Sequence, residues 1–195
     1  MSAAPAATNV TESTLERRIT VEEFEQMDFE FPVDLVRGRI EETPPPAPAH
    51  GRVCGNIYFL LESWVRSTGF GTVTCNDSAI VTDSALETVR GSDVAFIRWE
   101  SLPDRVLPVK AFRVAPDLVV EVLSPSQQWS KVEEKLADYL GAGVKEVWVV
   151  TFEERSVWVC RADNGRRRLD ETDELTSPEL LPGFSCRVVD FFLHV

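Results

Sequence analysis

Residues Arg113–Leu123 read R-V-A-P-D-L-V-V-E-V-L, and Ser124-Pro125-Ser126 ends this run. Residues 118–123 are apolar apart from Glu121, a pattern that predicts a central strand covered on both faces. Asp117 and Glu121 are four residues apart, so the strand period of two places both on one face. A buried ionised carboxylate is costly unless a cation compensates it. Two interpretations follow: Asp117 caps the strand and Glu121 pairs with an arginine, or the carboxylates belong to a cluster that holds a metal.

The composition is typical of a globular protein with one domain. The chain has 195 residues, of which 44% are hydrophobic and 27% charged, and this length is sufficient to bury a core. We expect residues 19–195 to form a single domain. The start of the chain has neither the basic segment nor the apolar core of a secretory signal, so we do not expect a signal peptide. We expect residues 1–18 to be a disordered tail.

The cysteines and the hydropathy favour a cytoplasmic protein without a membrane segment. Cys54, Cys75, Cys160 and Cys186 form no C-x-x-C pair, which argues against a zinc site or a disulfide framework and for reduced thiols. No apolar stretch has the length needed to span a bilayer.

The net charge of −12 argues against tight non-specific binding of nucleic acid, because a general polyanion binder carries a basic face. It does not exclude a metal-dependent enzyme that acts on a phosphodiester. In such an enzyme the cations would be local, and a metal would neutralise part of the acidic excess.

The order of predicted elements indicates an α/β or α+β fold with a mixed sheet. A capping box at Thr20–Glu23 predicts a short helix, and apolar residues at helical spacing predict longer helices over about 50–67 and 130–140. Pro44–Pro48 is expected to be an extended connector. Short strands are expected at 33–40 (as a hairpin), 71–75, 78–81, 93–97, 118–123, 144–151, 156–160 and 166–169.

Two acidic residues on neighbouring predicted strands have the layout of a metal-dependent nuclease. Asp93 opens one strand and Glu121 lies within the next. Two such carboxylates can bind Mg²⁺, which lowers the pKa of a water and neutralises charge on a phosphate. A lysine normally follows the Glu by two residues, but that position is Leu123. The core signature is therefore incomplete on the strand.

A lysine on the following helix is the candidate replacement. The apolar stripe of this helix comprises Val132, Leu136, Tyr139 and Leu140. Lys135 lies on that stripe, so we expect it to face the sheet, whereas Lys131 lies on the opposite, solvent side. A lysine on an apolar stripe often extends its ammonium out to water. With two carboxylates on the adjacent strands, we favour an active-site role for Lys135.

Four ordered motifs carry a family resemblance. They are P-P-P-A-P-A-H-G-R-V at 44–53, S-D-V-A-F-I at 92–97, A-P-D-L-V-V-E-V-L-S-P-S at 115–126, and E-E-K-L-A-D-Y-L-G-A-G-V-K-E-V-W-V-V at 133–150. Together they resemble the Uma2 family (domain of unknown function 820), which consists of endonucleases with a PD-(D/E)XK-like fold. The likeness covers roughly residues 20–192.

The resemblance implies a restriction-endonuclease-like mixed β-sheet flanked by helices. It implies catalytic roles for Asp34, Asp93, Glu121 and Lys135, with Asp93 and Glu121 binding Mg²⁺ or Mn²⁺. Asp34 falls where members usually carry a Glu, one carbon longer, and Ser92 replaces a usual Pro. DNA is the implied substrate. A homodimer is expected because duplex cleavage uses two active sites.

Other candidate substrate contacts are His50 and the basic run Arg166, Arg167 and Arg168. His50 heads a helix, where it either contacts phosphate, assists acid–base chemistry or caps the helix. The arginines either bind phosphate or form a solvated strand edge.

Two functions remain open at this point. One is a metal-dependent DNA endonuclease with a migrated lysine, and the other is an inactive nuclease-like module that binds DNA or a protein partner. Leu123, the shorter Asp34 and the acidic charge favour the module, and the retained four-residue set favours the enzyme.

Overall fold

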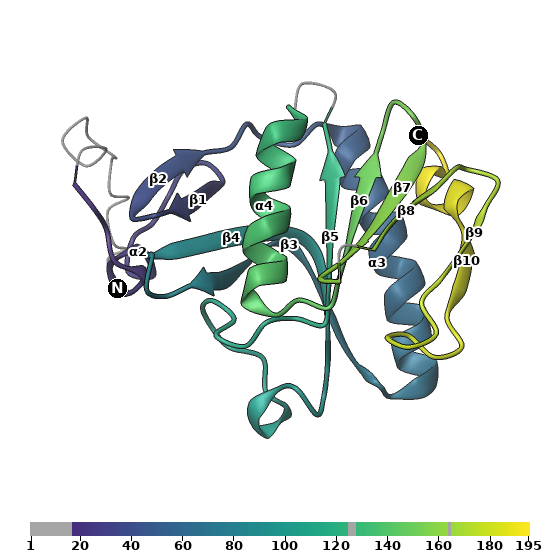
Figure 1. Cartoon of the computed structure of the whole chain (residues 1–195), viewed down its shortest axis with the longest axis horizontal. Helices are drawn as coiled ribbons and strands as arrows, with labels where there is room; N and C mark the ends of the chain where they lie inside the picture. The colour runs from purple at the N-terminus through teal and green to yellow at the C-terminus, as the bar shows by residue number, and fades with distance from the viewer. Residues whose placement is uncertain (1–16, 125–127, 164) are drawn as a thin grey trace, which may run out of the picture.

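The computed structural model describes residues 17–124, 128–163 and 165–195 (Figure 1). Its helices are α2 (Val21–Phe24), α3 (Pro48–Thr68) and α4 (Trp129–Ala142), with short 3-10 turns η1 (Pro103–Arg105) and η2 (Val188–Phe192). Its strands are β1 (Val33–Val36), β2 (Arg39–Glu42), β3 (Gly71–Asp83), β4 (Thr88–Arg98), β5 (Leu118–Leu123), β6 (Glu146–Thr151), β7 (Ser156–Arg161), β8 (Arg166–Leu169), β9 (Glu174–Thr176) and β10 (Ser185–Arg187).

A mixed sheet forms the centre of the described chain. Its strand order is β2-β1-β4-β5-β6-β7-β8, with β3 paired to β4, and β9 and β10 form a separate small sheet. β5 and β6 are parallel and are connected through α4, whereas the other pairs in the large sheet are antiparallel. This confirms the predicted mixed sheet with flanking helices.

The two long helices cover opposite faces of this sheet (Figure 1). Along β5, Leu118, Val120 and Val122 pack in the cluster that contains α3, while Val119 and Leu123 pack in the cluster that contains α4. Because side chains alternate along a strand, Glu121 shares the α4 face with Val119 and Leu123. β5 is buried along its whole length, as its apolar sequence predicts.

Helix boundaries follow the local sequence, with one correction. The sequence placed Pro48 in an extended connector, but Pro48 is the first residue of α3. Proline suits that position, because its missing N–H has no partner in the first turn of a helix. Gly69 caps the C-terminus of α3, and Gly143 caps that of α4. Both glycines have a left-handed backbone conformation, with φ of 68° and 104°.

The largest departure from the expected elements is in β3. The sequence predicted two short strands at 71–75 and 78–81, whereas the structure has one strand with a bulge at Asn76 and Asp77. Both bulge residues have positive φ, 71° and 52°. Since β4 pairs with β3 on both sides of this bulge, β4 also starts earlier than predicted, at Thr88 rather than Asp93.

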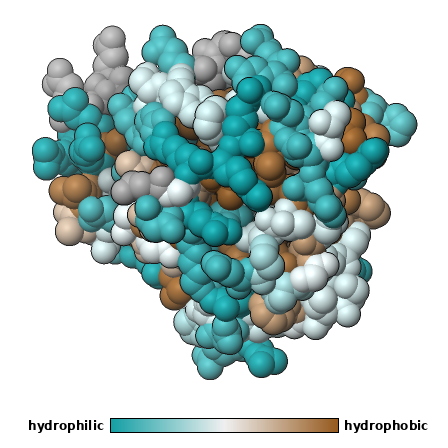
Figure 2. Space-filling view, turned by 45° about the vertical axis from the view of Figure 1, so that its right-hand side comes forward, coloured by the Kyte–Doolittle hydropathy of each residue, from teal (hydrophilic) through white to brown (hydrophobic). Residues whose placement is uncertain are grey.

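The surface is mixed in character. Hydrophilic residues predominate over much of the face in Figure 2, with hydrophobic residues interspersed. Of the helices in the described part of the chain, none has both the length and the hydropathy required to cross a membrane. The tail expected at 1–18 lies outside the described residues except for Arg17 and Arg18, and Arg17 pairs with Glu23.

Candidate active site

The site lies where β1 and β5 separate along β4. β1 pairs with β4 at Val89, and β5 pairs with it at residues 94–96, so residues 90–93 lie between the two ladders. Side chains supply partners for the backbone there. The N–H of Gly91 donates to Asp34 Oδ1 at 2.9 Å, and the N–H of Val122 donates to Asp93 Oδ2 at 2.7 Å. We call this gap between β1 and β5 along β4 the fork of the sheet. Because buried backbone groups must be paired, the N–H groups at the fork fix the positions of both carboxylates.

Glu121 and Lys135 form a buried ion pair across the face that α4 covers. Lys135 Nζ lies 3.2 Å from Glu121 Oε2 and 3.2 Å from the carbonyl oxygen of Gly91, to which it also donates. The Tyr139 hydroxyl, one turn further along α4, lies 2.7 Å from Glu121 Oε1 and 2.8 Å from the same carbonyl. Both oxygens of Glu121 are therefore fixed by residues of α4.

The electrostatics of this pair indicate an excess of negative charge. Burial raises the pKa of Glu121 to about 7, although Lys135 acts in the opposite direction. Burial lowers the pKa of Lys135, but Glu121, Asp34 and Asp93 outweigh it and raise that pKa above the ordinary range. Lys135 is thus a permanent cation, surrounded by more carboxylate charge than it can neutralise.

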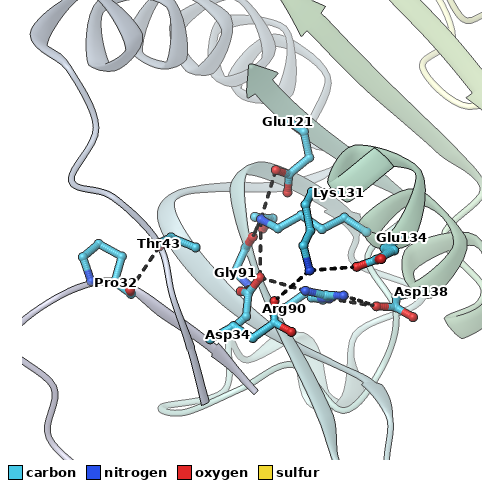
Figure 3. A network of polar contacts seen from close by, with 12 residues as sticks. Pro32, Asp34, Thr43, Arg90, Gly91, Glu121, Lys131, Glu134 and Asp138 are labelled. Carbon is cyan, nitrogen blue, oxygen red and sulfur yellow. Dashed lines mark hydrogen bonds and ion pairs between the residues drawn. The ribbon is translucent and has the colours of Figure 1, made fainter. Parts of the chain in front are cut away.

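Asp34 is joined to the site through Arg90 (Figure 3). Arg90 Nη1 donates to Asp34 Oδ2 at 3.1 Å, and Arg90 Nη2 lies 2.7 Å from Asp138 Oδ2 on α4. Asp34 Oδ2 is also 3.7 Å from Lys135 Nζ. The Arg90 side chain is only 4% exposed. It therefore links β1, β4 and α4 through a buried network and fixes the side of α4 that carries Lys135.

Asp93 contacts α3 on its other side. His50 Nε2 lies 3.3 Å from Asp93 Oδ2, and Cys54 Sγ lies 3.5 Å from His50 Nδ1. The hydrogen bond with Asp93 raises the pKa of His50, although burial acts against it. Burial raises the pKa of the Cys54 thiol well above its usual range. His50 is therefore held against Asp93 rather than directed freely at solvent.

The β3 bulge adds an acidic residue that the motif analysis did not include. Asp77 lies in the bulge opposite Asp93. It is close to Gly91, because a Cβ atom added to that glycine would lie 3.4 Å from the Cβ of Asp77. Desolvation and repulsion from Asp93 and Asp34 raise the pKa of Asp77, with Lys135 opposing. Bulges commonly redirect a side chain next to an active site. Here the bulge brings a further carboxylate to the same cluster.

The structure brings together Asp34, Asp93, Glu121 and Lys135, as the sequence motifs predict. It places Lys131 on the exposed side of α4, with Nζ 3.2 Å from Glu134 and 3.4 Å from Glu41. Asp117 is separate: it accepts hydrogen bonds from Arg98 and Lys145 at the start of β5. The interpretation of Asp117 as a strand cap is therefore correct, and Glu121 pairs with a lysine rather than an arginine.

The arginine run lies away from this cluster. β8 is the third strand from β5 in the sheet, so at ordinary strand spacing the two strands are about 14 Å apart. Arg166 makes a bidentate pair with Glu133 at 2.7 Å, Arg167 donates to the carbonyl oxygen of Thr176, and Arg168 pairs with Glu154. Each arginine thus has a partner within the chain.

Sequence reasoning missed Arg90, Tyr139, Asp77 and Cys54 as parts of this region. Tyr139 was expected as a core residue on the apolar stripe, and its hydroxyl is what distinguishes it from a Leu there. A buried hydroxyl needs a polar partner, so its position one turn after Lys135 was a usable signal. Arg90 and Asp77 gave no such signal, because their roles depend on the fork and the bulge.

The pKa of Glu121 predicts a pH dependence of stability in the metal-free protein. The ordinary pKa of Glu is 4.5 and the folded value is about 7, so folding favours the protonated form. The stability that this adds is complete below pH 4.5 and disappears as the pH rises through 7, a loss on the order of 3 kcal/mol. Thermal melts from pH 5 to 8, compared with Glu121→Gln, measure it. If the stability of the wild type and of Glu121→Gln changed with pH in the same way, the raised pKa of Glu121 would be contradicted.

Comparisons with known proteins agree with this fold. A family profile described as "Uma2: Putative restriction endonuclease" matches residues 21–189. A solved structure described as "a putative nuclease belonging to DUF820", from Anabaena variabilis, superposes with a TM-score of 0.78 at 21% identity, covering 89% of this chain and 97% of that one. At that identity the likeness shows the fold alone. No curated protein matches the chain.

Proposed function

Since its profile matches residues 21–189, the chain belongs to the Uma2 family of restriction-endonuclease-like proteins, and we propose that it is a metal-dependent DNA endonuclease. One observation carries the proposal. Asp93 on β4, Glu121 on β5 and Lys135 on α4 converge at the fork of the sheet, although they come from three separate elements. Two carboxylates beside a buried cation are the groups that phosphodiester hydrolysis requires.

The donor set fits Mg²⁺ or Mn²⁺. Asp93 and Glu121 offer only oxygen atoms, which hard divalent cations prefer. The carboxylates Asp34, Asp77, Asp93 and Glu121 all interact with Lys135, and Arg90 divides its charge between Asp34 and Asp138. Burial and, in smaller part, repulsion from Asp93 and Asp34 raise the pKa of Glu121. A divalent cation between Asp93 and Glu121 would offset the repulsion between them.

Each residue of the site has a distinct proposed role. A bound Mg²⁺ would supply an acidified water and neutralise phosphate charge. Lys135, held by Glu121 and the carbonyl of Gly91, would stabilise the negative charge that develops on the phosphate. Tyr139 fixes the orientation of Glu121, and Asp34 assists by holding Lys135 and Arg90 in place.

Divalent metal should stabilise the protein. At a concentration 100 times its dissociation constant, a ligand of the native state contributes about 2.7 kcal/mol. For a chain of this size that corresponds to roughly 5–10 °C in Tm. Melts with and without millimolar MgCl₂ or MnCl₂ measure this shift. Glu121→Gln keeps the side-chain volume but removes the charge, so its shift should be much smaller. The absence of a metal-dependent shift in the wild type would contradict the metal site.

Contacts with DNA outside the cluster are less direct. His50 borders Asp93 and is the nearer candidate for a phosphate contact. The run Arg166–Arg168 would have to exchange Glu133 and Glu154 for phosphate, so its role stays a prediction, tested by the salt dependence of DNA binding in a triple Ser variant. We also propose that residues 19–195 act as one nuclease domain and pair as a homodimer for duplex cleavage.

A second candidate function is a nuclease-like module that binds DNA or a protein without cleaving it. The observation that favours it is Leu123, which occupies the usual lysine position and packs in the apolar cluster under α4. Lys135 supplies a cation to the same carboxylate from the helix, which favours the enzyme. Metal binding without DNA cleavage would decide for the module.

A further inference from the structure

A second cluster of metal-ligating atoms lies on the α3 side of Asp93. His50 and Cys54 are one turn apart on α3, and Asp93 on β4 faces them. One ligand atom from each of the three residues lies within 4.8 Å of the other two. All three side chains are half-buried, so they are partly shielded from water yet reachable by a small ion.

The chemistry of this cluster differs from that of the oxygen site. It offers an imidazole nitrogen, a thiol sulfur and a carboxylate oxygen. Thiolate and imidazole suit borderline-soft transition metals, whereas Mg²⁺ is bound through oxygen. Three protein ligands with one open position are typical of catalytic or exchangeable zinc sites, while structural sites use four.

We propose that His50, Cys54 and Asp93 form a binding site for a transition-metal dication such as Zn²⁺. Binding forms a sulfur–metal bond, and the proton of the Cys54 thiol leaves to solvent. The absence of a C-x-x-C pair argued against zinc at the level of sequence, but this site needs one cysteine, supplied on the same helical face as a histidine. Without metal, the thiol and the carboxylate hold the two ring nitrogens of His50.

Sharing of Asp93 gives the site a regulatory consequence, which rests on the proposed nuclease function. A Zn²⁺ ion on Asp93 takes a ligand from the site formed by Asp93 and Glu121. Zn²⁺ therefore inhibits Mg²⁺-dependent cleavage, and loss of Cys54 relieves that inhibition.

Cobalt is the probe for the site itself, because Co²⁺ bound to a thiolate has a charge-transfer band in the near ultraviolet. Untagged, metal-free protein is titrated with CoCl₂ under reducing conditions. The band should appear in the wild type and in Cys75→Ser, whose cysteine is exposed and outside the cluster. It should be absent in Cys54→Ser. No band in the wild type, or an unchanged band in Cys54→Ser, would overturn the site.

His50→Ala provides an independent variant that retains the thiol. Loss of a direct ligand should weaken Co²⁺ binding by more than ~10-fold, the lower end of what removal of an outer-shell partner costs. Unchanged affinity would overturn the role of His50, and a thermal melt of each variant verifies that it is folded.

The inhibition is tested on plasmid DNA in excess Mg²⁺ with added ZnCl₂. Zn²⁺ should inhibit the wild type and Cys75→Ser more strongly than Cys54→Ser. Equal inhibition of all three would overturn the regulatory role. Absence of cleavage in every protein, with the cobalt band present, would instead overturn the nuclease function and leave the metal site established.

Discussion

Lys135→Met should abolish most DNA cleavage while the protein remains folded and able to bind metal. Methionine keeps the length and volume of the side-chain stem but removes the ammonium that lies 3.2 Å from Glu121. Loss of one preorganised group that stabilises transition-state charge lowers a rate by about 10²–10³-fold. Glu121 is already close to protonation at neutral pH, so it can become neutral when its partner is lost. The measurement is the nicking rate of supercoiled plasmid at saturating Mg²⁺.

Lys131→Met is the matched control, because it removes the same charge from the exposed side of the same helix. Its ammonium contacts only the exposed carboxylates Glu41 and Glu134. We expect a change within about 0.5 kcal/mol in stability and no change in rate. In Lys135→Met, the Mg²⁺-induced rise in Tm should be at least as large as in the wild type, because the carboxylates have lost their cation. Similar rates for Lys135→Met and Lys131→Met would contradict the migrated-lysine role.

Arg90→Met should cause the largest loss of stability among single changes near the site. Arg90 is nearly inaccessible and bridges Asp34 to Asp138, so its removal leaves Asp138 without this cation and Asp34 with only Lys135, 3.7 Å away. Breaking a buried pair in this way costs about 3–5 kcal/mol. For a chain of this size the corresponding fall in Tm is roughly 10 °C. Urea denaturation and thermal melts both measure it.

Two further variants identify the cause of that loss. Arg66→Met removes an arginine from an exposed pair with Glu62, and it should cost no more than about 0.5 kcal/mol. Adding Asp34→Asn to Arg90→Met should recover part of the lost stability, because the uncompensated charge on β1 is gone. A double variant that is less stable than Arg90→Met would show that packing, rather than charge, dominates.

The positions of Glu121 and Lys135 in the candidate site could be predicted from the sequence because they depend on local periodicity. Alternation along 118–123 places Glu121 on one face, and the apolar stripe of α4 places Lys135 on the side facing the sheet. These two patterns converge because β5 leads into α4 and α4 packs on β5. The fold class followed from the order of the predicted elements, in which two long helices lie among short strands.

The rest depends on pairings between residues distant in sequence. Arg90 falls just before the strand predicted at 93–97, and its burial follows only when β4 starts earlier and β1 and β5 separate on either side of it. The bulge that brings Asp77 to the cluster appears in the sequence as a break between two short strands. His50 was a helix-start residue with several possible roles, and the packing of α3 against β4 selects Asp93 as its partner.

Nicking of supercoiled plasmid by the wild type and by Asp93→Asn, purified in parallel, tests the central claim most directly. An asparagine side chain retains the size of the Asp93 side chain but lacks the charge that a divalent cation requires. The account predicts that the wild type nicks DNA only with Mg²⁺ or Mn²⁺, that EDTA stops it, and that Asp93→Asn is at least about 10²-fold slower. Equal nicking by both proteins, nicking that survives EDTA, or metal binding by a wild type that leaves DNA intact would contradict it.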